Sequence, residues 1–225
     1  MKRSEVNQIL RETKEFLAAH QFVLPPFANW SPADWRARGT EADEIRDNCL
    51  GWDITDFGAG DFQHLGLTLF TIRNGNYQDA RYTKPYAEKI MVVAENQVTP
   101  MHFHALKMED IINRGGGNLL IELYNATDTD ELAKTPVTVS VDGVRRTIAP
   151  GEILRLTPGE SITMTPRLYH KFYGEPGKGR VLVGEVSRVN DDRTDNRFYE
   201  QTGRFPAIEE DEQPLHLLCN EYPRP

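Results

Sequence analysis

The spacing of apolar residues changes near residue 60, and this change constrains the fold of the chain more than any other feature. Before it, the apolar residues of 4–22 recur every three or four positions, which predicts a helix. Ser31-Pro32, with Asp34 three residues after the serine, predicts the start of a second helix. Residues 48–61 contain glycines and several aspartates, which predicts a loop. After residue 60, apolar and polar residues alternate, as they do in strands with one buried face.

Short strands separated by tight turns are predicted throughout this second part. The strongest signal is a hairpin of residues 137–141 and 144–148, because Asp142-Gly143 between them supplies the positive φ angles of a type I′ turn. The other predicted strands are 64–69, 87–94, 153–156, 161–165 and 181–186. About seven or more short strands with closely spaced turns are typical of an antiparallel barrel or sandwich. No glycine-rich phosphate loop follows a strand, which argues against a nucleotide-binding α/β fold.

The charge balance narrows the class of partner. The chain has 34 acidic and 26 basic residues, a formal net charge of −8. This charge repels nucleic acid and anionic membrane surfaces, so we expect neither as a partner.

No apolar segment follows the basic N-terminus, and no apolar run approaches the ~18 residues of a membrane span. Cys49 and Cys219 lie far apart and form neither a disulfide framework nor a zinc motif. We therefore expect a cytoplasmic protein.

Two of the six histidines stand as His102-Phe103-His104. In a strand, residues i and i+2 point to one face, so both imidazoles can reach a common point. Glu109 follows five residues later, and a short turn would bring it back toward the same point. His170, after the predicted strand 161–165, is the natural fourth ligand. Three imidazoles and one carboxylate suit a first-row divalent ion such as Mn²⁺, Fe²⁺, Co²⁺, Ni²⁺ or Zn²⁺.

The alternative for these residues is structural. A lone His-x-His pair in a strand is more often two half-exposed histidines than a metal site. The spacing of Glu109, the glycine run 115–117 and the downstream His170 favour the metal here. The remaining histidines are expected to have structural or surface roles: His20, His64 and His216.

These residues resemble the cupin signature. His102-x-His104, four residues, Glu109, six residues and Gly116 match the core of its first motif, although Asn96 replaces the usual opening glycine. The second motif is looser, since Pro166 stands one residue closer to His170 than is usual. A closer resemblance covers most of the chain. Residues 89–117 and 184–198 are similar to the D-lyxose isomerases, a cupin family of sugar isomerases.

The resemblance implies a fold and an activity. The fold is all-β, a cupin β-barrel of antiparallel jelly-roll type over residues 61–225, with residues 1–60 as an N-terminal helical extension packed on its outside. The activity is interconversion of D-lyxose with D-xylulose, and of D-mannose with D-fructose. The family resemblance also implies Mn²⁺ as the cofactor, other divalent first-row ions being possible, and a homodimer.

Two further residues are predicted to transfer protons. Isomerisation moves one proton between C1 and C2 and another between O1 and O2, so it needs a base and an acid. Glu185 lies in the apolar run 181–186, where a carboxylate is costly unless it faces a polar cavity. If Lys107 and Glu109 lie on one strand, they share the face toward the metal, the alternative being a solvated surface lysine. A nearby cation should lower the pKa of Lys107. We expect Glu185 as base and Lys107 as acid, with the reverse assignment open.

Sugar hydroxyls need polar partners, because each must replace its hydrogen bonds to water. The polar loop 190–198 is expected either to supply them or to be a solvated turn. Other candidates to line the pocket lie on the predicted strands and beside them, including a phenylalanine as an apolar wall. The predicted substrate-binding residues are Lys89, Gln97, Phe172, Asp192, Arg193 and Asp195.

Three other functions fit the same ligands, since one fold hosts many chemistries. An Fe²⁺ dioxygenase would consume oxygen. A phosphosugar isomerase would need an Arg/Lys cluster for the phosphate, and no basic run lies beside the metal motif. A non-catalytic sugar-binding cupin often lacks some ligands, whereas all four positions are filled here.

Overall fold

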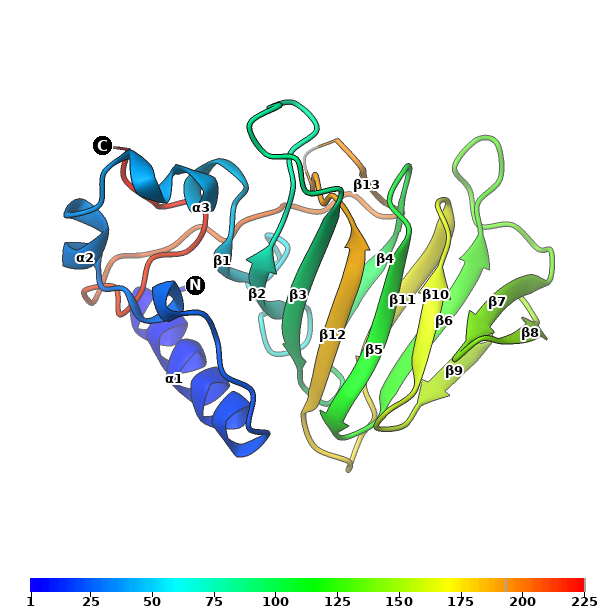
Figure 1. The fold of residues 1–225 in the computed structure, drawn as a ribbon. Coiled ribbons are helices and arrows are strands. Elements are labelled where there is room, and N and C mark those ends of the chain that lie inside the picture. Colours follow the sequence, from blue (N-terminus) through cyan, green and yellow to red (C-terminus); the bar gives the residue numbers. More distant parts are fainter. Residues whose placement is uncertain (193, 225) are drawn as a thin grey trace.

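The computed structural model describes residues 1–192 and 194–224. In that part of the chain, the strands form two antiparallel sheets that face each other beside a helical N-terminal segment (Figure 1). The larger sheet has eight strands in the order β1-β2-β3-β12-β5-β10-β7-β8, and the smaller has five in the order β13-β4-β11-β6-β9. The all-β cupin class with an N-terminal helix is confirmed. The strands pair as two separate sheets of a sandwich, so the predicted closure into one continuous barrel is not confirmed.

The helical segment consists of α1 (Arg3–Ala19), α2 (Pro32–Arg36) and α3 (Asp43–Asp47), with 3-10 turns at Pro26–Asn29 and Thr40–Ala42. The larger sheet consists of β1 (Gly51–Thr55), β2 (Leu67–Arg73), β3 (Tyr86–Val93), β12 (Val181–Arg188), β5 (Glu109–Gly116), β10 (Ser161–Met164), β7 (Val137–Val141) and β8 (Val144–Ile148). The smaller sheet consists of β13 (Asn196–Phe198), β4 (Thr99–His104), β11 (Leu168–Gly174), β6 (Leu119–Asn125) and β9 (Ile153–Leu156).

The main core lies between the two sheets. On β6, Leu119, Ile121 and Leu123 alternate with more exposed residues and are fully buried. They pack in one apolar cluster with residues from the facing sheet, such as Val139 and Val183. The period of two read from the sequence therefore does define the buried faces.

Helix α1 lies at the β1 end of the larger sheet (Figure 1) and packs in a cluster with residues of β1, β2, β3 and β12. Val6 and Leu10 point from the helix into a second apolar cluster with Ile90 of β3 and Leu182 of β12. At the start of α2, Asp34 N–H donates to Ser31 Oγ at 3.2 Å, which confirms the predicted cap. The two clusters place apolar packing on both faces of β3 and β12. This packing holds the two strands, and the polar side chains they carry, in fixed positions.

Removing the Leu10 side chain should destabilise the protein. The Leu10→Ala variant is expected to lose about 2–5 kcal/mol of unfolding free energy, because Leu10 is fully buried and truncation leaves a cavity. Urea unfolding measures this change. Val23→Ala is the matched control, since Val23 is 89% exposed and should change the free energy by less than ~0.5 kcal/mol. Equal losses in the two variants would contradict the packing of α1 against the sheet.

The loop predicted over residues 48–61 was wrong in its first half. Residues 51–55 form β1, whose five residues are all buried, and Trp52 pairs with Phe70 of β2. The glycines and aspartates of the segment obscured this strand in the sequence, because its burial depends on distant parts of the chain. Helix α1 packs in one cluster with its apolar face, and Arg204 contacts Asp53 and Thr55 on the other face. The division of the chain at residue 60 stays a prediction, with β1 hydrogen-bonded into the larger sheet ahead of that position.

The Asp142-Gly143 hairpin is confirmed. β7 and β8 pair antiparallel with Val141 opposite Val144, and both turn residues have positive φ, 49° and 79°.

None of the helices in the described part of the chain is long and apolar enough to cross a membrane.

Candidate active site

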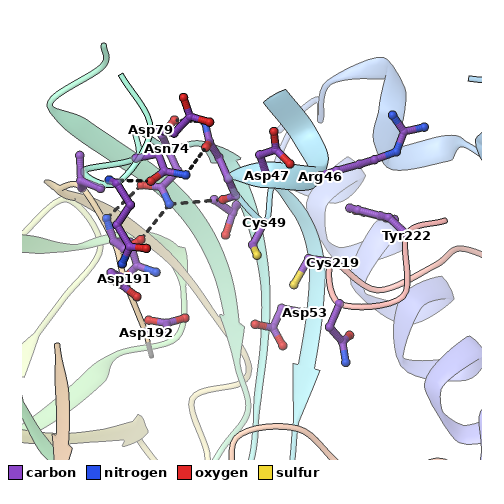
Figure 2. A pocket seen from close by; sticks show the side chains of 18 of the residues that line it. Arg46, Asp47, Cys49, Asp53, Asn74, Asp79, Asp191, Asp192, Cys219 and Tyr222 are labelled. Atoms are coloured by element: carbon purple, nitrogen blue, oxygen red, sulfur yellow. Dashed lines mark hydrogen bonds between the residues drawn. The ribbon is translucent and has the colours of Figure 1, made fainter. Parts of the chain in front are cut away.

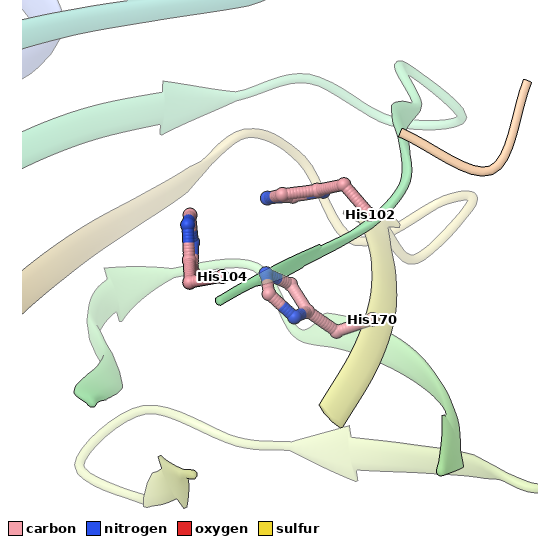
Figure 3. A group of neighbouring side chains, drawn as sticks. All are labelled: His102, His104 and His170. Carbon is pink, nitrogen blue, oxygen red and sulfur yellow. The ribbon is translucent and has the colours of Figure 1, made fainter. Parts of the chain in front are cut away.

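Three histidines converge between the sheets (Figure 3). His102 and His104 lie on β4, and His170 on β11 is paired with His102 across the two strands. One ring nitrogen from each lies within 4.8 Å of the others. His170 Nε2 is buried and has no hydrogen-bond partner. A buried polar atom without a partner is costly, so this cluster fits a bound cation.

The outer nitrogen of each imidazole is already engaged. His102 Nδ1 lies 2.7 Å from the Pro100 carbonyl, and His170 Nδ1 lies 3.0 Å from the Leu168 carbonyl. Carbonyl oxygens only accept, so these nitrogens carry the proton and leave Nε2 as a lone-pair donor. Burial lowers the pKa of His102 well below its ordinary value and that of His170 to about 4. Both rings are therefore neutral, as metal ligands must be.

Glu109 at the start of β5 adds a carboxylate to the cluster. Its Oε1 lies 3.3 Å from Nε2 of His104 and 3.3 Å from Nε2 of His170. Burial alone would raise the pKa of Glu109, but Lys107 and His104 outweigh it and hold that pKa well below its ordinary value. The resulting set of three nitrogens and one anionic oxygen matches the preferences of first-row divalent ions.

An ion-paired network adjoins the cluster. Lys107 Nζ lies 2.7 Å from Glu109 Oε2 and 2.9 Å from Glu185 Oε1. Lys89 on β3 is opposite Glu185 of β12, and its Nζ lies 3.3 Å from Glu185 Oε2. Ser187 Oγ donates to Glu185 Oε1 at 2.9 Å. The carboxylate of Glu185 thus lies between Lys89 and Lys107. Lys107 also contacts Glu109 and so connects Glu185 to the histidine cluster.

The two candidate proton-transfer groups have opposite charges. Burial would raise the pKa of Glu185, but Lys107 and Lys89 lower it overall, so the group is a carboxylate. Burial would lower the pKa of Lys107, but Glu109 and Glu185 raise it above its ordinary value. The carboxylates of Glu109 and Glu185 therefore act against the lowered pKa of Lys107 that the sequence predicted. That prediction considered a nearby cation but not these two buried carboxylates. A protonated lysine beside an ionised carboxylate is an acid–base pair.

The structure brings three of the predicted substrate-binding residues to the cavity and leaves two outside it. Lys89, Phe172 and Asp192 line the same cavity as the histidines. Gln97 does not, because its amide donates to the Phe62 carbonyl at 2.7 Å and accepts from Ala94 N–H at 3.2 Å. Asp195 does not either, and its carboxylate instead accepts from the backbone N–H groups of residues 106 and 107. Arg193 lies outside the described residues.

Sequence reasoning missed several residues of the site. Asn190 Oδ1 accepts from Lys89 Nζ at 2.7 Å and from Lys107 Nζ at 3.1 Å. Phe198 stacks on the His102 ring with centroids 5.3 Å apart, and Arg204 lines the cavity while paired with Asp192 at 2.8 Å. The polar loop 190–198 was the signal for Asn190 and Phe198, whereas no sequence feature marked Arg204. The contacts of Asn190 with Lys89 and of Phe198 with His102 join residues roughly a hundred positions apart.

Asn196 is expected to tune the metal site through His104. Its Oδ1 lies 2.8 Å from His104 Nδ1, which sets the tautomer and orientation of that ring. The Asn196→Ala variant should bind Mn²⁺ about 10–100-fold more weakly, the usual cost of losing such a partner. Isothermal titration would measure the affinity, with Asn76→Ala outside the cavity as the control. Unchanged affinity would show that His104 does not depend on this contact.

The other three histidines take no part in the cluster, as expected. His20 Nδ1 contacts the Phe16 carbonyl at 2.9 Å, and His216 Nδ1 contacts the Trp30 carbonyl at 3.0 Å. His64 is exposed and paired with Asp61.

A larger polar cleft of about 860 Å³ adjoins the cavity (Figure 2). The two spaces share Asp192 and Arg204, so this ion pair forms part of the wall between them. The partly exposed residues of the cavity lining all lie in the segment 192–204, whereas its other lining residues are buried. The cavity therefore reaches the surface beside Asp192, Asn196, Phe198 and Arg204.

Comparisons with known proteins identify the family of the chain. The family model for D-lyxose isomerase matches residues 1–222. A D-lyxose/D-mannose isomerase of Serratia proteamaculans is 58% identical over 225 residues, covering 100% of this chain and 99% of the relative. One of Escherichia coli O157:H7 is 54% identical over 223 residues, covering 99% of this chain and 98% of the relative.

Several solved structures of similar fold carry the name L-ribose isomerase. An L-ribose isomerase of Cellulomonas parahominis, solved with L-ribose, has a TM-score of 0.61 at 17% identity, covering 93% of this chain and 98% of its own. One of Acinetobacter sp. DL28, also with L-ribose, has a TM-score of 0.63 at 17% identity with the same coverage. These structures support the fold alone. From its sequence matches, the chain belongs to the D-lyxose isomerase family and is therefore an enzyme, a sugar isomerase.

Proposed function

We propose that this enzyme is a metal-dependent aldose–ketose isomerase that interconverts D-lyxose with D-xylulose and D-mannose with D-fructose. Its relatives carry the name D-lyxose/D-mannose isomerase. The observation that carries the proposal is the pair of Glu185 and Lys107, 2.9 Å apart and buried beside the three-histidine cluster. Such a pair can move protons on a sugar held in the cavity.

In the proposed reaction, the Glu185 carboxylate removes the proton from C2 of the aldose and returns it to C1. Lys107 donates a proton toward O1, and the proton leaving O2 restores the lysine, so the exchange passes through an enediol and balances. Lys89 and Ser187 hold the Glu185 carboxylate by contacts of 3.3 and 2.9 Å. Their role is to fix its orientation, since a proton acceptor must lie within hydrogen-bond reach of its target.

His102, His104, Glu109 and His170 would hold a divalent ion. When bound, such an ion supplies Lewis-acid stabilisation of the negative charge that develops on the sugar oxygens. The donor set suits Mn²⁺, which we propose as the cofactor on the family resemblance, together with a homodimeric state and a cytoplasmic location.

A neutral sugar fits the cavity better than a phosphosugar. Of the basic lining residues, Lys89 and Lys107 are already paired with the buried Glu185, and Arg204 is paired with Asp192. Arg204 also pairs with Asp53. A phosphate would have to compete with these pairs for its cations, whereas sugar hydroxyls need only hydrogen bonds.

The test is an isomerase assay on protein stripped with EDTA. We expect no ketose from D-lyxose or D-mannose before Mn²⁺ is added back, and ketose from both afterwards. The ratio of the two rates gives the preferred sugar. Protein that has rebound Mn²⁺ and still forms no ketose from either sugar would overturn the proposal. Full turnover in the stripped protein would overturn the metal dependence alone.

A further inference from the structure

Thr99 carries an unpaired hydroxyl inside the reaction cavity. Its side chain lines the cavity with the histidines and is 3% exposed. The Oγ1 atom is buried and has no hydrogen-bond partner. A buried hydroxyl of this kind costs free energy, and native proteins retain few of them without a reason.

A bulge in β4 turns Thr99 toward the cavity. Strict alternation would put Thr99 on the opposite face from His102, because three positions separate them. In the structure His102 is opposite His170, and Thr99 is opposite Phe172, so β4 spends one more residue than β11 over this stretch. An extra residue in one strand re-aims the side chains beyond it. Thr99 therefore shares the inner face with His102, His170 and Phe172.

The surroundings of Thr99 offer its hydroxyl no partner. Phe172 is opposite Thr99 on β11, and the cavity lining also includes the apolar side chains of Phe57 and Leu67. The other threonine of the lining, Thr55, is satisfied, since it donates to the Arg204 carbonyl at 2.6 Å and accepts from Phe57 N–H at 2.9 Å. Of the threonine hydroxyls in the described lining, only that of Thr99 has its hydrogen-bonding capacity available.

The distance along the strand suggests which part of a sugar Thr99 meets. Thr99 pairs with β11 two residues beyond the His102–His170 pair, a step of about 7 Å in an antiparallel strand. That step compares with the span of a pentose from its first oxygens to its last. A sugar whose C1 and C2 lie between the histidines and Glu185 therefore has the length to bring its far end to Thr99.

We propose that Thr99 is a specificity-determining residue that binds a distal hydroxyl of the sugar, at C4 or C5. This inference rests on the proposed isomerase function. Binding would satisfy the Thr99 hydroxyl and the sugar hydroxyl together, in a part of the cavity where apolar side chains satisfy neither. A site that hydrogen-bonds a substrate hydroxyl discriminates against an analogue that lacks it.

The experiment compares Thr99→Val with Thr99→Ser in Mn²⁺-loaded protein. Valine keeps the branched shape and loses the hydroxyl, whereas serine keeps the hydroxyl. We expect Thr99→Val to lower kcat/KM for D-lyxose about tenfold, and Thr99→Ser to stay close to the unmodified enzyme. With 4-deoxy- or 5-deoxy-D-lyxose, whichever lacks the bound hydroxyl, the difference between Thr99→Val and the unmodified enzyme should vanish.

Thermal unfolding supplies a second readout. Without sugar, Thr99→Val should melt at or above the temperature of the unmodified protein, because it removes an unpaired buried hydroxyl. With D-lyxose, its sugar-dependent rise in Tm should be smaller. Equal kinetics of Thr99→Val and the unmodified enzyme on D-lyxose would overturn the Thr99 assignment alone. If the unmodified protein showed no turnover and no sugar-dependent rise in Tm, the proposed function and this inference would both be overturned.

Discussion

Replacing Glu185 by glutamine is expected to lower kcat about 10³-fold, within the 10²–10⁴ that a positioned acid or base contributes. The amide keeps the shape of the carboxylate but cannot accept the C2 proton. Mn²⁺ should still bind, because Glu185 contacts the lysines and Ser187 rather than the histidine cluster. Isomerisation of D-lyxose and Mn²⁺ titration on the same preparation measure both effects.

The charge change also affects stability, and this has to be separated from chemistry. Lys89 and Lys107 would both lose a buried counter-charge, which costs about 3–5 kcal/mol when a buried pair is broken. Glu185→Asp keeps the negative charge but shortens the side chain by one methylene. This variant should therefore be more stable than Glu185→Gln and still lose most of its turnover. Glu88→Gln on the same sheet is the control, since Glu88 pairs with the exposed Arg73. Retained turnover in Glu185→Gln would exclude Glu185 as the base.

Removing His170 should abolish metal binding and turnover together. The His170→Ala variant is expected to weaken Mn²⁺ binding by more than ~100-fold, beyond what loss of an outer partner costs. The reason is that His170 Nε2 is buried, neutral and without a hydrogen-bond partner, so its lone pair is available to a metal. Titration of EDTA-treated protein with Mn²⁺ measures the affinity, and the isomerase assay measures the activity.

His64→Ala is the control for this variant, because His64 is exposed and outside the cavity. It should bind Mn²⁺ and turn over D-lyxose like the unmodified enzyme. A His170→Ala variant that bound Mn²⁺ with unchanged affinity would show that His170 is not a metal ligand. A folded variant that lost turnover but not metal would move His170 from metal ligand to a contact of the sugar.

Local sequence patterns predicted the parts of the site that lie close together in the chain. His102 and His104 share a face because residues two apart on a strand always do, and Glu109 follows across a short turn. Glu185 was found from its cost in an apolar strand, which only a polar cavity relieves. The hairpin at Asp142-Gly143 followed from the φ angles that its turn requires.

Contacts between distant segments were not predictable in this way. Asn190 joins Lys89 and Lys107, and Asn196 holds His104, only because the loop after β12 returns to the cavity. Gln97 looked like a pocket residue, but its amide is engaged by Phe62 and Ala94, which no spacing rule reveals. Side-chain partners from other elements decide such roles, and they depend on the packed fold.

The sequence by itself determined the β-rich class, the three-histidine set with its carboxylate, and the buried Glu185, because each depends on a local period or a local cost. Only the tertiary structure decided that residues 51–55 form a strand, since α1 buries one of its faces and Arg204 contacts the other. It also decided that Thr99 points inward, since one extra residue in β4 reverses the alternation of sides. A local pattern gives a side chain's face only while the strand is regular, and irregularities are set by the neighbours with which the strand pairs.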